Sequence, residues 1–520
     1  MFEFALAIGI YSYLILGLGL LGKLYFLPLS LVSACFWSLF LMMMRKGEWL
    51  EWGSLKKFFT DKLVLSLLAI LFIQGIFNLI GALSPELSFD ALWYHLTLAK
   101  LYVAKHQIFH IPGGLLYYSS MPRLTEMLYT AALIFKDEIL AKLIHWLFGI
   151  LSAIALFKLL RRYLNTRFSF LGTVIFYTLL VVGWQSTTAY VDLTRTFFEL
   201  LALTYFLHWL KEKGSWLWKS GLMMGLSLST KHLGLETLLV FIALIILFSS
   251  KKFKSLKSLI QFSGASLGVV FPWYLLAFLN TGNPLYPLFT DWFKAHQIGD
   301  WAVFLINPWQ MTFRLDNLLT PVFLILLPLV LIKIWQEKRA IKITALYFLF
   351  GYVFWFLSPP SSARYLLPFI PALIFVCMKI LASSKKAIQK IAIGAIVLAC
   401  VLNLGSRMIA TQKFLPVVLG KETKKEFLSQ RLNFDYGDFY DVDGYFKENI
   451  KEDDLVLIYN IHNLYYVDFP FVHESWVRPG TYFTHILIKE MDLPEKFGEL
   501  ELLYENKRTK VKLYRYGDFY

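Results

Sequence analysis

Apolar residues occur along the chain in long runs separated by short polar segments. Runs near the ~20 residues that cross the hydrocarbon core of a bilayer fall at residues 2–22, 24–44, 63–83, 139–160, 168–185, 193–210, 215–230, 233–249, 259–280, 318–335, 343–358, 365–383 and 391–408. This pattern predicts an all-α polytopic membrane protein with about 13 transmembrane helices.

Short basic segments separate alternate pairs of these runs. They are "RKGEWLEWGSLKK", "RRYLNTR", "KEKGSWLWK", "KKFKSLK", "QEKRAIK" and "KKAIQK". Because basic loops stay on the cytoplasmic side of a membrane, one threading places all six there, with the N-terminus inside and the C-terminus outside. The net charge of +15 then indicates orientation rather than nucleic-acid binding.

The same threading predicts two long external loops, at residues 84–138 and 281–317. The first contains "MPRLTEMLYTAALIF" at 121–135, but counting this stretch as another span would move every later basic loop to the outside. We therefore expect amphipathic helices that lie along the membrane surface, with Pro122 in the first turn of one of them.

Beyond residue 408 the pattern changes. Charged residues of both signs become frequent, and short β-like runs such as "DLVLIYN" and "KVKLYRY" appear. We expect a transmembrane catalytic domain over residues 1–408 and a small external α/β domain over residues 409–520. With 57% hydrophobic residues and a mean hydropathy of +0.56, the chain as a whole cannot be a soluble protein.

Ionisable residues from four distant segments fall at one depth on the external face. Asp90 lies just beyond the third run, Asp192 begins the sixth, Lys231 and His232 form a turn between two runs, and Arg364 begins the twelfth. Ionisable groups at such depth are costly unless they pair, contact water or bind a charged ligand. Their coincidence predicts a functional site.

Each residue also has a purely structural interpretation. Asp90 suits the N-cap of a helix that begins near Ala91. Asp192 is one helical turn from Arg195 and could pair with it. Lys231 and Arg364 could be anchors whose charges reach the interface.

Four neighbouring groups are weaker candidates. His95 and His232 have the alternative of being satisfied packing residues, and Glu86 and Lys100 are expected to be solvated.

The four main residues favour chemistry on a phosphate-linked substrate. Asp90 can orient or deprotonate a hydroxyl or amine nucleophile. Arg364 can bind a phosphate in bidentate fashion, and Lys231 can neutralise the charge that develops on it. Since the outside of a cell has no supply of nucleotide sugars, a lipid-linked sugar is the expected donor.

At these residues the sequence resembles the GT-C superfamily of glycosyltransferases, which includes protein O-mannosyltransferases, oligosaccharyltransferases and the lipid A aminoarabinose transferase. The resemblance covers about residues 60–385 and is strongest to the bacterial branch with protein-mannosyltransferase-like cores. "SFDALWYHLTLAKLY" gives the family's catalytic aspartate as Asp90, and "AYVDLT" gives Asp192. "GLSLSTKHLG" gives Lys231, and "ARYLLPFIP" gives Arg364. Where some protein mannosyltransferases have an acidic pair, this chain has Phe89 before Asp90.

The resemblance implies an inverting glycosyltransferase that moves a sugar from a polyprenyl-phosphate donor to an envelope lipid, glycan or protein on the external face of a bacterial inner membrane. It implies that Asp90 is the base, that Lys231 and Arg364 bind the donor phosphate, and that Asp192 is a second carboxylate. The residues expected to line the pocket are Tyr94, His95, His232 and Tyr365.

A metal ion and two other functions stay open. Asp90 and Asp192 could jointly hold a divalent cation, whereas no His or Cys spacing argues for zinc. A transporter or flippase for an envelope precursor competes with the enzyme, although transporters usually place ionisable residues at mid-bilayer in inverted repeats. The other competitor is a non-catalytic scaffold for envelope assembly.

Overall fold

The computed structural model describes residues 1–44, 60–212, 214–248, 252–291, 293, 320–358 and 362–520. Its helices are α1 (Phe2–Leu20), α2 (Phe26–Met44), α4 (Lys62–Ala82), α5 (Leu96–Lys105), α6 (Leu124–Phe135), α7 (Glu138–Arg161), α8 (Thr166–Thr178), α9 (Leu180–Gln185), α10 (Asp192–Glu212), α11 (Trp216–Thr230), α12 (Gly234–Phe248), α13 (Lys252–Thr281), α15 (Val322–Lys333), α16 (Arg339–Leu357), α17 (Ala363–Leu366), α18 (Ile370–Ala382), α19 (Lys386–Thr411), α20 (Leu415–Val418), α21 (Lys424–Arg431) and α22 (Tyr445–Asn449). The strands are β1 (Val456–Tyr459), β2 (Phe471–His473), β3 (Tyr482–Lys489), β4 (Leu502–Asn506) and β5 (Val511–Phe519).

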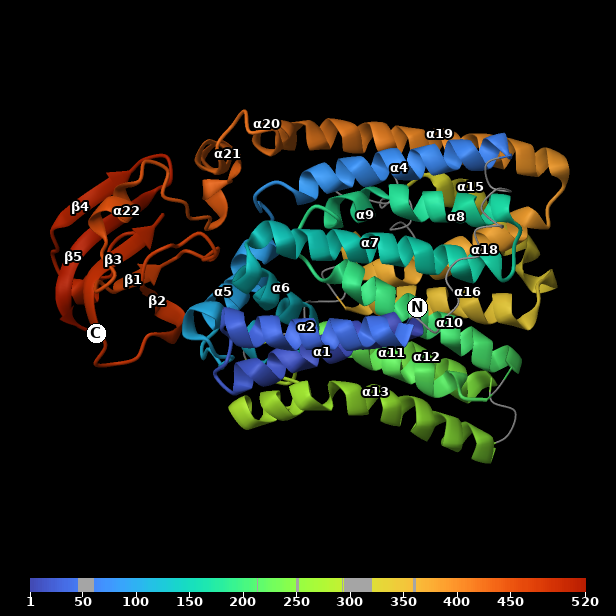
Figure 1. Ribbon diagram of the computed structural model, residues 1–520, viewed down its shortest axis with the longest axis horizontal. Coiled ribbons are helices and arrows are strands. Elements are labelled where there is room, and N and C mark those ends of the chain that lie inside the picture. Colours follow the sequence, from blue (N-terminus) through green and yellow to red (C-terminus); the bar gives the residue numbers. More distant parts are fainter. Residues whose placement is uncertain (45–59, 213, 249–251, 292, 294–319, 359–361) are drawn as a thin grey trace.

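The predicted fold class is confirmed, because every predicted apolar run contains a helix. The helices lie side by side in one bundle, with the C-terminal domain at one end (Figure 1). In the described part of the chain, 8 helices are long and apolar enough to cross a membrane. The number of spans stays a prediction, since α10 is charged and α8, α11 and α12 are short.

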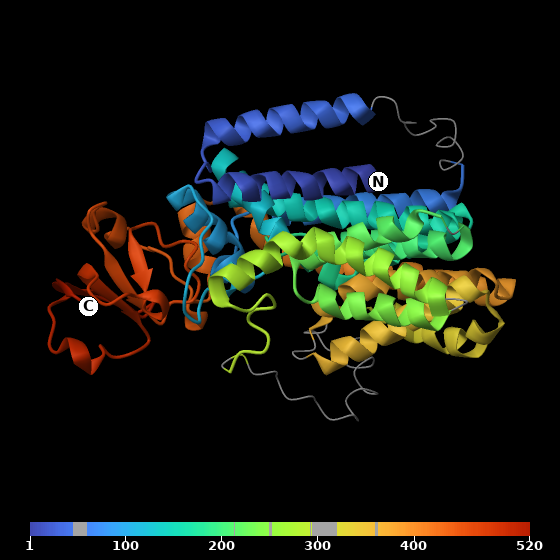
Figure 2. The ribbon, with the colours of Figure 1, turned by 90° about the horizontal axis from the view of Figure 1, so that it is seen from below.

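Three basic loops that lie wholly within the described residues are at the end of the bundle opposite the C-terminal domain. This is plain in Figure 1 for the loops that join α7 to α8, α15 to α16 and α18 to α19. They contain "RRYLNTR", "QEKRAIK" and "KKAIQK". The arrangement agrees with the predicted threading, whereas the side of the membrane on which each end lies stays a prediction. Figure 2 shows α2 on the outer side of α1, at the edge of the bundle.

The first long loop contains α5 and α6, but α6 differs from the predicted surface helix. Its residues from Leu124 to Ala132 are all buried. They include Glu126, which pairs with His95 at 2.7 Å. α6 therefore packs inside the protein rather than along the membrane surface. Pro122 also differs from its prediction, since it precedes the N-cap residue Arg123 rather than standing in the first turn.

The second long loop begins where α13 ends, at Thr281. Most of the predicted loop, residues 294–317, lies outside the described residues.

The C-terminal domain contains a mixed five-stranded sheet with the order β2-β1-β3-β5-β4. β1 pairs in parallel with β2 and β3, whereas β5 is antiparallel to β3 and β4. The two runs predicted as strands correspond to β1 and β5. All four residues of β1 are buried, so this interior strand lies in the core of the domain.

Lys100 fixes the C-terminal domain to the bundle. Its Nζ donates hydrogen bonds to the carbonyl oxygens of Tyr465 and Val467, both at 2.7 Å, and to Oδ1 of Asp468 at 2.8 Å. The expectation that Lys100 is solvated is therefore wrong. The sequence could not reveal this contact, because the acceptors lie more than 360 residues away.

Candidate functional site

The predicted site residues Asp90 and Arg364 meet at the end of the bundle next to the C-terminal domain. Nη1 of Arg364 lies 2.7 Å from Oδ2 of Asp90, and both side chains are partly exposed, at 12% and 14%. Asp90 stands at the start of the helix that leads into α5, and Arg364 lies in α17. The structure thus joins two residues that are far apart in sequence.

A second ion pair joins Asp192 to Lys231. Nζ of Lys231 lies 3.1 Å from Oδ1 of Asp192. Asp192 is the first residue of α10, where the helix dipole favours a negative charge, and Lys231 follows the last residue of α11, where the dipole favours a positive one. The predicted alternative of a pair between Asp192 and Arg195 is wrong, because Arg195 pairs with Glu199.

Aromatic rings connect the two ion pairs. The ring of Tyr365 lies 4.8 Å from Nζ of Lys231 and 4.8 Å from Cζ of Arg364, and its hydroxyl accepts a hydrogen bond from Nη2 of Arg364 at 2.9 Å. The guanidinium of Arg364 also lies 5.0 Å above the ring of Tyr190. Contacts of this kind favour a cation at the site. All four predicted charged residues are therefore brought into one cluster.

Two tyrosines hold Asp90 in place. The Tyr94 hydroxyl donates to Oδ2 of Asp90 at 3.2 Å, and the backbone N–H of Asp90 donates to the Tyr190 hydroxyl at 3.2 Å. Burial raises the pKa of both tyrosines, and the negative charge of Asp90 raises it further. Both hydroxyls therefore stay protonated at neutral pH, and the Tyr94 hydroxyl donates to the Asp90 carboxylate while the Tyr190 hydroxyl accepts from its backbone N–H.

Asp90 is not a helix cap in the chemical sense. It occupies the N-cap position of a π-helical turn over Ala91–His95, but its carboxylate makes no capping hydrogen bond. The backbone N–H of Leu96 bonds to the carbonyl of Ala91, five residues back. Such turns often occur at functional sites. The Asp90 carboxylate is therefore directed to Arg364 and Tyr94.

Glu86 joins the segment before Asp90 to the segment before Asp192. Its Oε1 accepts hydrogen bonds from the backbone N–H groups of Leu87 at 2.9 Å and Ser88 at 2.8 Å, and its Oε2 accepts one from Ala189 at 2.6 Å. Only 1% of Glu86 is exposed, so the expectation that it is solvated is wrong. Its carboxylate acts as a structural link because backbone donors surround it.

His145 is a residue that the sequence analysis missed. Its Nδ1 lies 2.8 Å from the carbonyl oxygen of Thr188, and its Nε2 accepts a hydrogen bond from the backbone N–H of Leu193 at 3.1 Å. The ring thus spans both sides of Asp192. The available signal was a lone histidine within the apolar run 139–160.

Beneath the Lys231 turn, a buried network joins α10, α11 and α12. Nε of Arg195 lies 2.6 Å from Oε1 of Glu199, and neither side chain is exposed. Ser227 and Thr237 donate hydrogen bonds to Glu199 at 2.9 Å and 2.7 Å. This network fixes the helices that carry Asp192 and Lys231.

The two histidines predicted to line the pocket have other partners. Nδ1 of His95 lies 2.7 Å from Glu126, and both groups are buried. Nε2 of His232 lies 2.9 Å from the carbonyl oxygen of Tyr286. One ring nitrogen of each histidine is therefore bound outside the cluster, whereas Tyr94 and Tyr365 contact it directly.

No group of three or more His, Cys, Asp and Glu residues suited to a metal ion occurs in the described ranges. Asp90 and Asp192 each face a different cation. A divalent ion held by these two carboxylates stays a prediction.

Comparison with known proteins identifies the fold. Residues 127–275 match the family model described as dolichyl-phosphate-mannose-protein mannosyltransferase. The matched segment includes Asp192 and Lys231, whereas Asp90 and Arg364 lie outside it. A search of the curated proteins finds no significant match.

Solved structures extend the likeness to most of the chain. ArnT from Cupriavidus metallidurans in the apo state has a TM-score of 0.56 and 12% identity, over 87% of this chain and 97% of ArnT. Its complex with undecaprenyl phosphate has a TM-score of 0.59 and 11% identity over the same shares. An oligosaccharyltransferase from Archaeoglobus fulgidus has a TM-score of 0.46 and 10% identity, over 79% of this chain and 65% of its own.

The fold and the matched segment together confirm the predicted resemblance to the GT-C superfamily of membrane glycosyltransferases.

Proposed function

We propose that this chain transfers a sugar from a polyprenyl-phosphate donor to a lipid, glycan or protein acceptor, with inversion at the anomeric carbon. One observation carries the proposal. Two carboxylates and two cations from four distant segments form one cluster at one end of a membrane bundle. The ArnT structure of similar fold is bound to undecaprenyl phosphate, which supports a polyprenyl phosphate as the carrier.

In this proposal Arg364 and Lys231 bind the donor phosphate. Arg364 is the bidentate ligand, and its present partner Asp90 is released when the guanidinium turns to the phosphate. Lys231 adds a second positive charge from the other side of Tyr365. Both cations stabilise the charge that the phosphate gains as it leaves.

Asp90 is the proposed general base. It takes the proton of the acceptor hydroxyl or amine while that atom bonds to the anomeric carbon and the bond from this carbon to the phosphate oxygen breaks. The electron pair of the broken bond stays on the polyprenyl phosphate. A single displacement of this kind inverts the anomeric configuration.

Asp192 has two proposed roles. It holds Lys231 in place through their ion pair, and with Asp90 it is the proposed ligand pair for a divalent ion. Chelation separates these roles, because loss of transfer in EDTA that added Mg²⁺ or Mn²⁺ restores would require the metal.

We place the protein in the bacterial inner membrane with the cluster and the C-terminal domain outside. The three described basic loops at the opposite end of the bundle support this orientation. Labelling of single cysteines introduced in the C-terminal domain by a membrane-impermeant reagent tests it.

The decisive experiment compares sugar transfer by wild type and Asp90→Asn in nanodiscs, with a panel of polyprenyl-phosphate sugars and with envelope lipids and glycans as acceptors. We expect the folded variant to lose at least about a hundredfold in rate, the size of general-base catalysis. Asp453→Asn is the matched control, because Asp453 is exposed in the C-terminal domain. Equal rates for Asp90→Asn and wild type would favour the transporter or the scaffold.

A further inference from the structure

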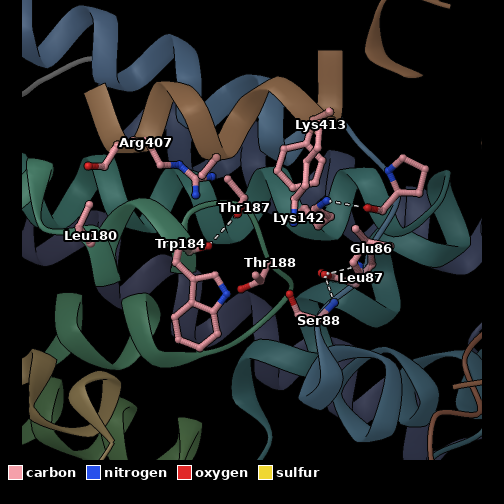
Figure 3. Close-up of a pocket in the computed structure, with 14 residues that line it drawn as sticks. Glu86, Leu87, Ser88, Lys142, Leu180, Trp184, Thr187, Thr188, Arg407 and Lys413 are labelled. Carbon is pink, nitrogen blue, oxygen red and sulfur yellow. Dashed lines mark hydrogen bonds between the residues drawn. The ribbon is translucent and has the colours of Figure 1, made fainter. Parts of the chain in front are cut away.

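A pocket separate from the candidate site lies beside the segment that leads to Asp90. It has a volume of about 490 Å³ and lies between residues 85–88, α7, the α9 region and α19. Figure 3 shows the polar side chains that point into it, among them Glu86, Lys142, Thr187, Arg407 and Lys413. The charges of this pocket are not balanced.

Arg407 is a buried cation that forms no ion pair within the described part of the chain. It is 7% exposed, and neither Nε nor Nη2 has a hydrogen-bond partner among the residues that the structure describes. Two glycines make room for it: a Cβ on Gly183 would lie 3.0 Å from its Cδ, and one on Gly81 would lie 3.2 Å from its Nη2. A guanidinium kept in such a place is costly unless an anion pairs with it.

The carboxylate of the pocket, Glu86, forms no ion pair with Arg407 among the described residues. Both oxygens of Glu86 already accept hydrogen bonds from backbone N–H groups. Lys142 is also satisfied, because its Nζ donates to the carbonyl oxygens of Ser84 at 2.6 Å and Pro85 at 3.1 Å. Arg407 and Lys413 are therefore left to bind an anion.

The surface beside the pocket suits an apolar tail. Leu402, Ser406, Ile409 and Lys413 are all exposed, and their spacing of four, three and four residues places them in one stripe along the helix. Leu402 and Ile409 are 62% and 69% exposed. α19 belongs to a helical segment long and apolar enough to cross a membrane. We therefore expect this stripe to face lipid. It ends at Lys413, and Arg407 is buried beside it.

We propose that this pocket binds the phosphate of an anionic membrane phospholipid, with Arg407 and Lys413 on the phosphate and the acyl chains along α19. Basic pockets between membrane helices recognise anionic head groups in this way. Arg407 supplies the planar fork of donors that a phosphate accepts.

The pocket shares two segments with the candidate site. The first segment contains Glu86, which lines the pocket, and Asp90 four residues later. The second contains Ala189, whose backbone N–H donates to Glu86, and the next residue, Tyr190, whose hydroxyl accepts a hydrogen bond from the N–H of Asp90. A bound lipid would hold both segments in place. We therefore also expect the transfer rate to depend on the lipid, an effect that rests on the proposed function, whereas lipid binding does not.

The test measures binding of phosphatidylglycerol by the purified full chain in a non-ionic detergent, by native mass spectrometry and by the shift in Tm. Phosphatidylcholine, whose phosphate charge is balanced by choline, and inorganic phosphate are the comparison ligands. We expect phosphatidylglycerol alone to bind and to raise Tm, and Arg407→Gln and Lys413→Gln each to weaken binding at least about tenfold, the effect of a lost charge-assisted contact.

Lys390→Gln is the matched control, because Lys390 is an exposed lysine at the other end of α19. If Arg407→Gln does not fold, the test uses Lys413→Gln alone, because Lys413 is exposed and its substitution should not disturb folding. Wild-type binding by Lys413→Gln, or equal binding of phosphatidylcholine, overturns the proposal. An equal Tm shift with inorganic phosphate would assign the pocket to a free anion instead. If lipid binds as expected while no sugar transfer is found, only the proposed function fails.

Discussion

Two ion pairs of similar length lie at different depths in the same bundle. In the pair of Arg195 and Glu199 the atoms are 2.6 Å apart and neither side chain is exposed. In the pair of Asp90 and Arg364 they are 2.7 Å apart, and each side chain keeps more than a tenth of its surface exposed. The first pair is closed to any ligand, and the second can exchange partners.

The partners of the two pairs show the same difference. Glu199 receives hydrogen bonds from Ser227 and Thr237, which leave its carboxylate satisfied on both oxygens. Asp90 receives only one side-chain hydroxyl besides Arg364 in the described chain. The comparison teaches that an ion pair fully enclosed by the protein maintains the fold, whereas a pair that keeps part of its surface exposed is available for chemistry.

The largest effect is expected from Glu199→Gln. Removing one charge of a fully buried pair leaves Arg195 uncompensated and should lower the free energy of unfolding by about 3 kcal/mol or more. Thermal unfolding in one detergent measures the change. Glu212→Gln is the control on the same helix, because its pair with Arg162 is partly exposed and should be worth less than about 1 kcal/mol. An unchanged Tm for Glu199→Gln would contradict the conclusion that the pair of Arg195 and Glu199 maintains the fold.

Asp192→Asn should have an intermediate effect on both properties. The Asp192 carboxylate is buried while Lys231 reaches the surface, so the loss of this charged hydrogen bond should cost about 2 kcal/mol of stability. The transfer rate should fall as well, because Lys231 loses its position. Unfolding curves and single-turnover rates of the same preparation check both. If stability changed while the transfer rate did not, the pair of Asp192 and Lys231 would have a structural role, like the pair of Arg195 and Glu199.

The smallest effect is expected from Arg364→Lys. The charge stays, but the planar fork that binds a phosphate through two N–H groups is lost. Donor kcat/KM should fall by about tenfold, equal to about 1.4 kcal/mol, with little change in Tm. Steady-state kinetics over a range of donor concentrations test this, with Arg339→Lys on α16 as control. A Tm that falls as far as that of Glu199→Gln would assign Arg364 a structural role.

Much of the fold was predictable because apolar run length and basic loops are local properties of the sequence. The four charged residues of the cluster were predictable for a related reason: once the threading is fixed, Asp90, Asp192, Lys231 and Arg364 must share one face. Which cation pairs with which carboxylate was not predictable. Pairing depends on helix packing, which the pattern of apolar residues does not encode.

The remaining errors have one physical cause. Glu86 and Lys100 are charged residues in a loop, and the usual expectation for such residues is solvation. Glu86 is buried and Lys100 is partly buried because distant backbone groups meet them: the N–H of Ala189 for Glu86, and the carbonyl oxygens of residues 465 and 467 for Lys100. Contacts across such separations appear only in three dimensions.

The π-helical turn over Ala91–His95 has a consequence for how this site can vary. Such a turn is equivalent to one residue inserted into an α-helix. Deleting that residue would restore regular geometry and would rotate Asp90 by about 100° relative to α5, the angle of one α-helical residue. The carboxylate would then point away from Arg364. The inserted residue therefore sets the direction in which the Asp90 side chain points. The number of residues in this turn is as constrained as the identity of Asp90 itself.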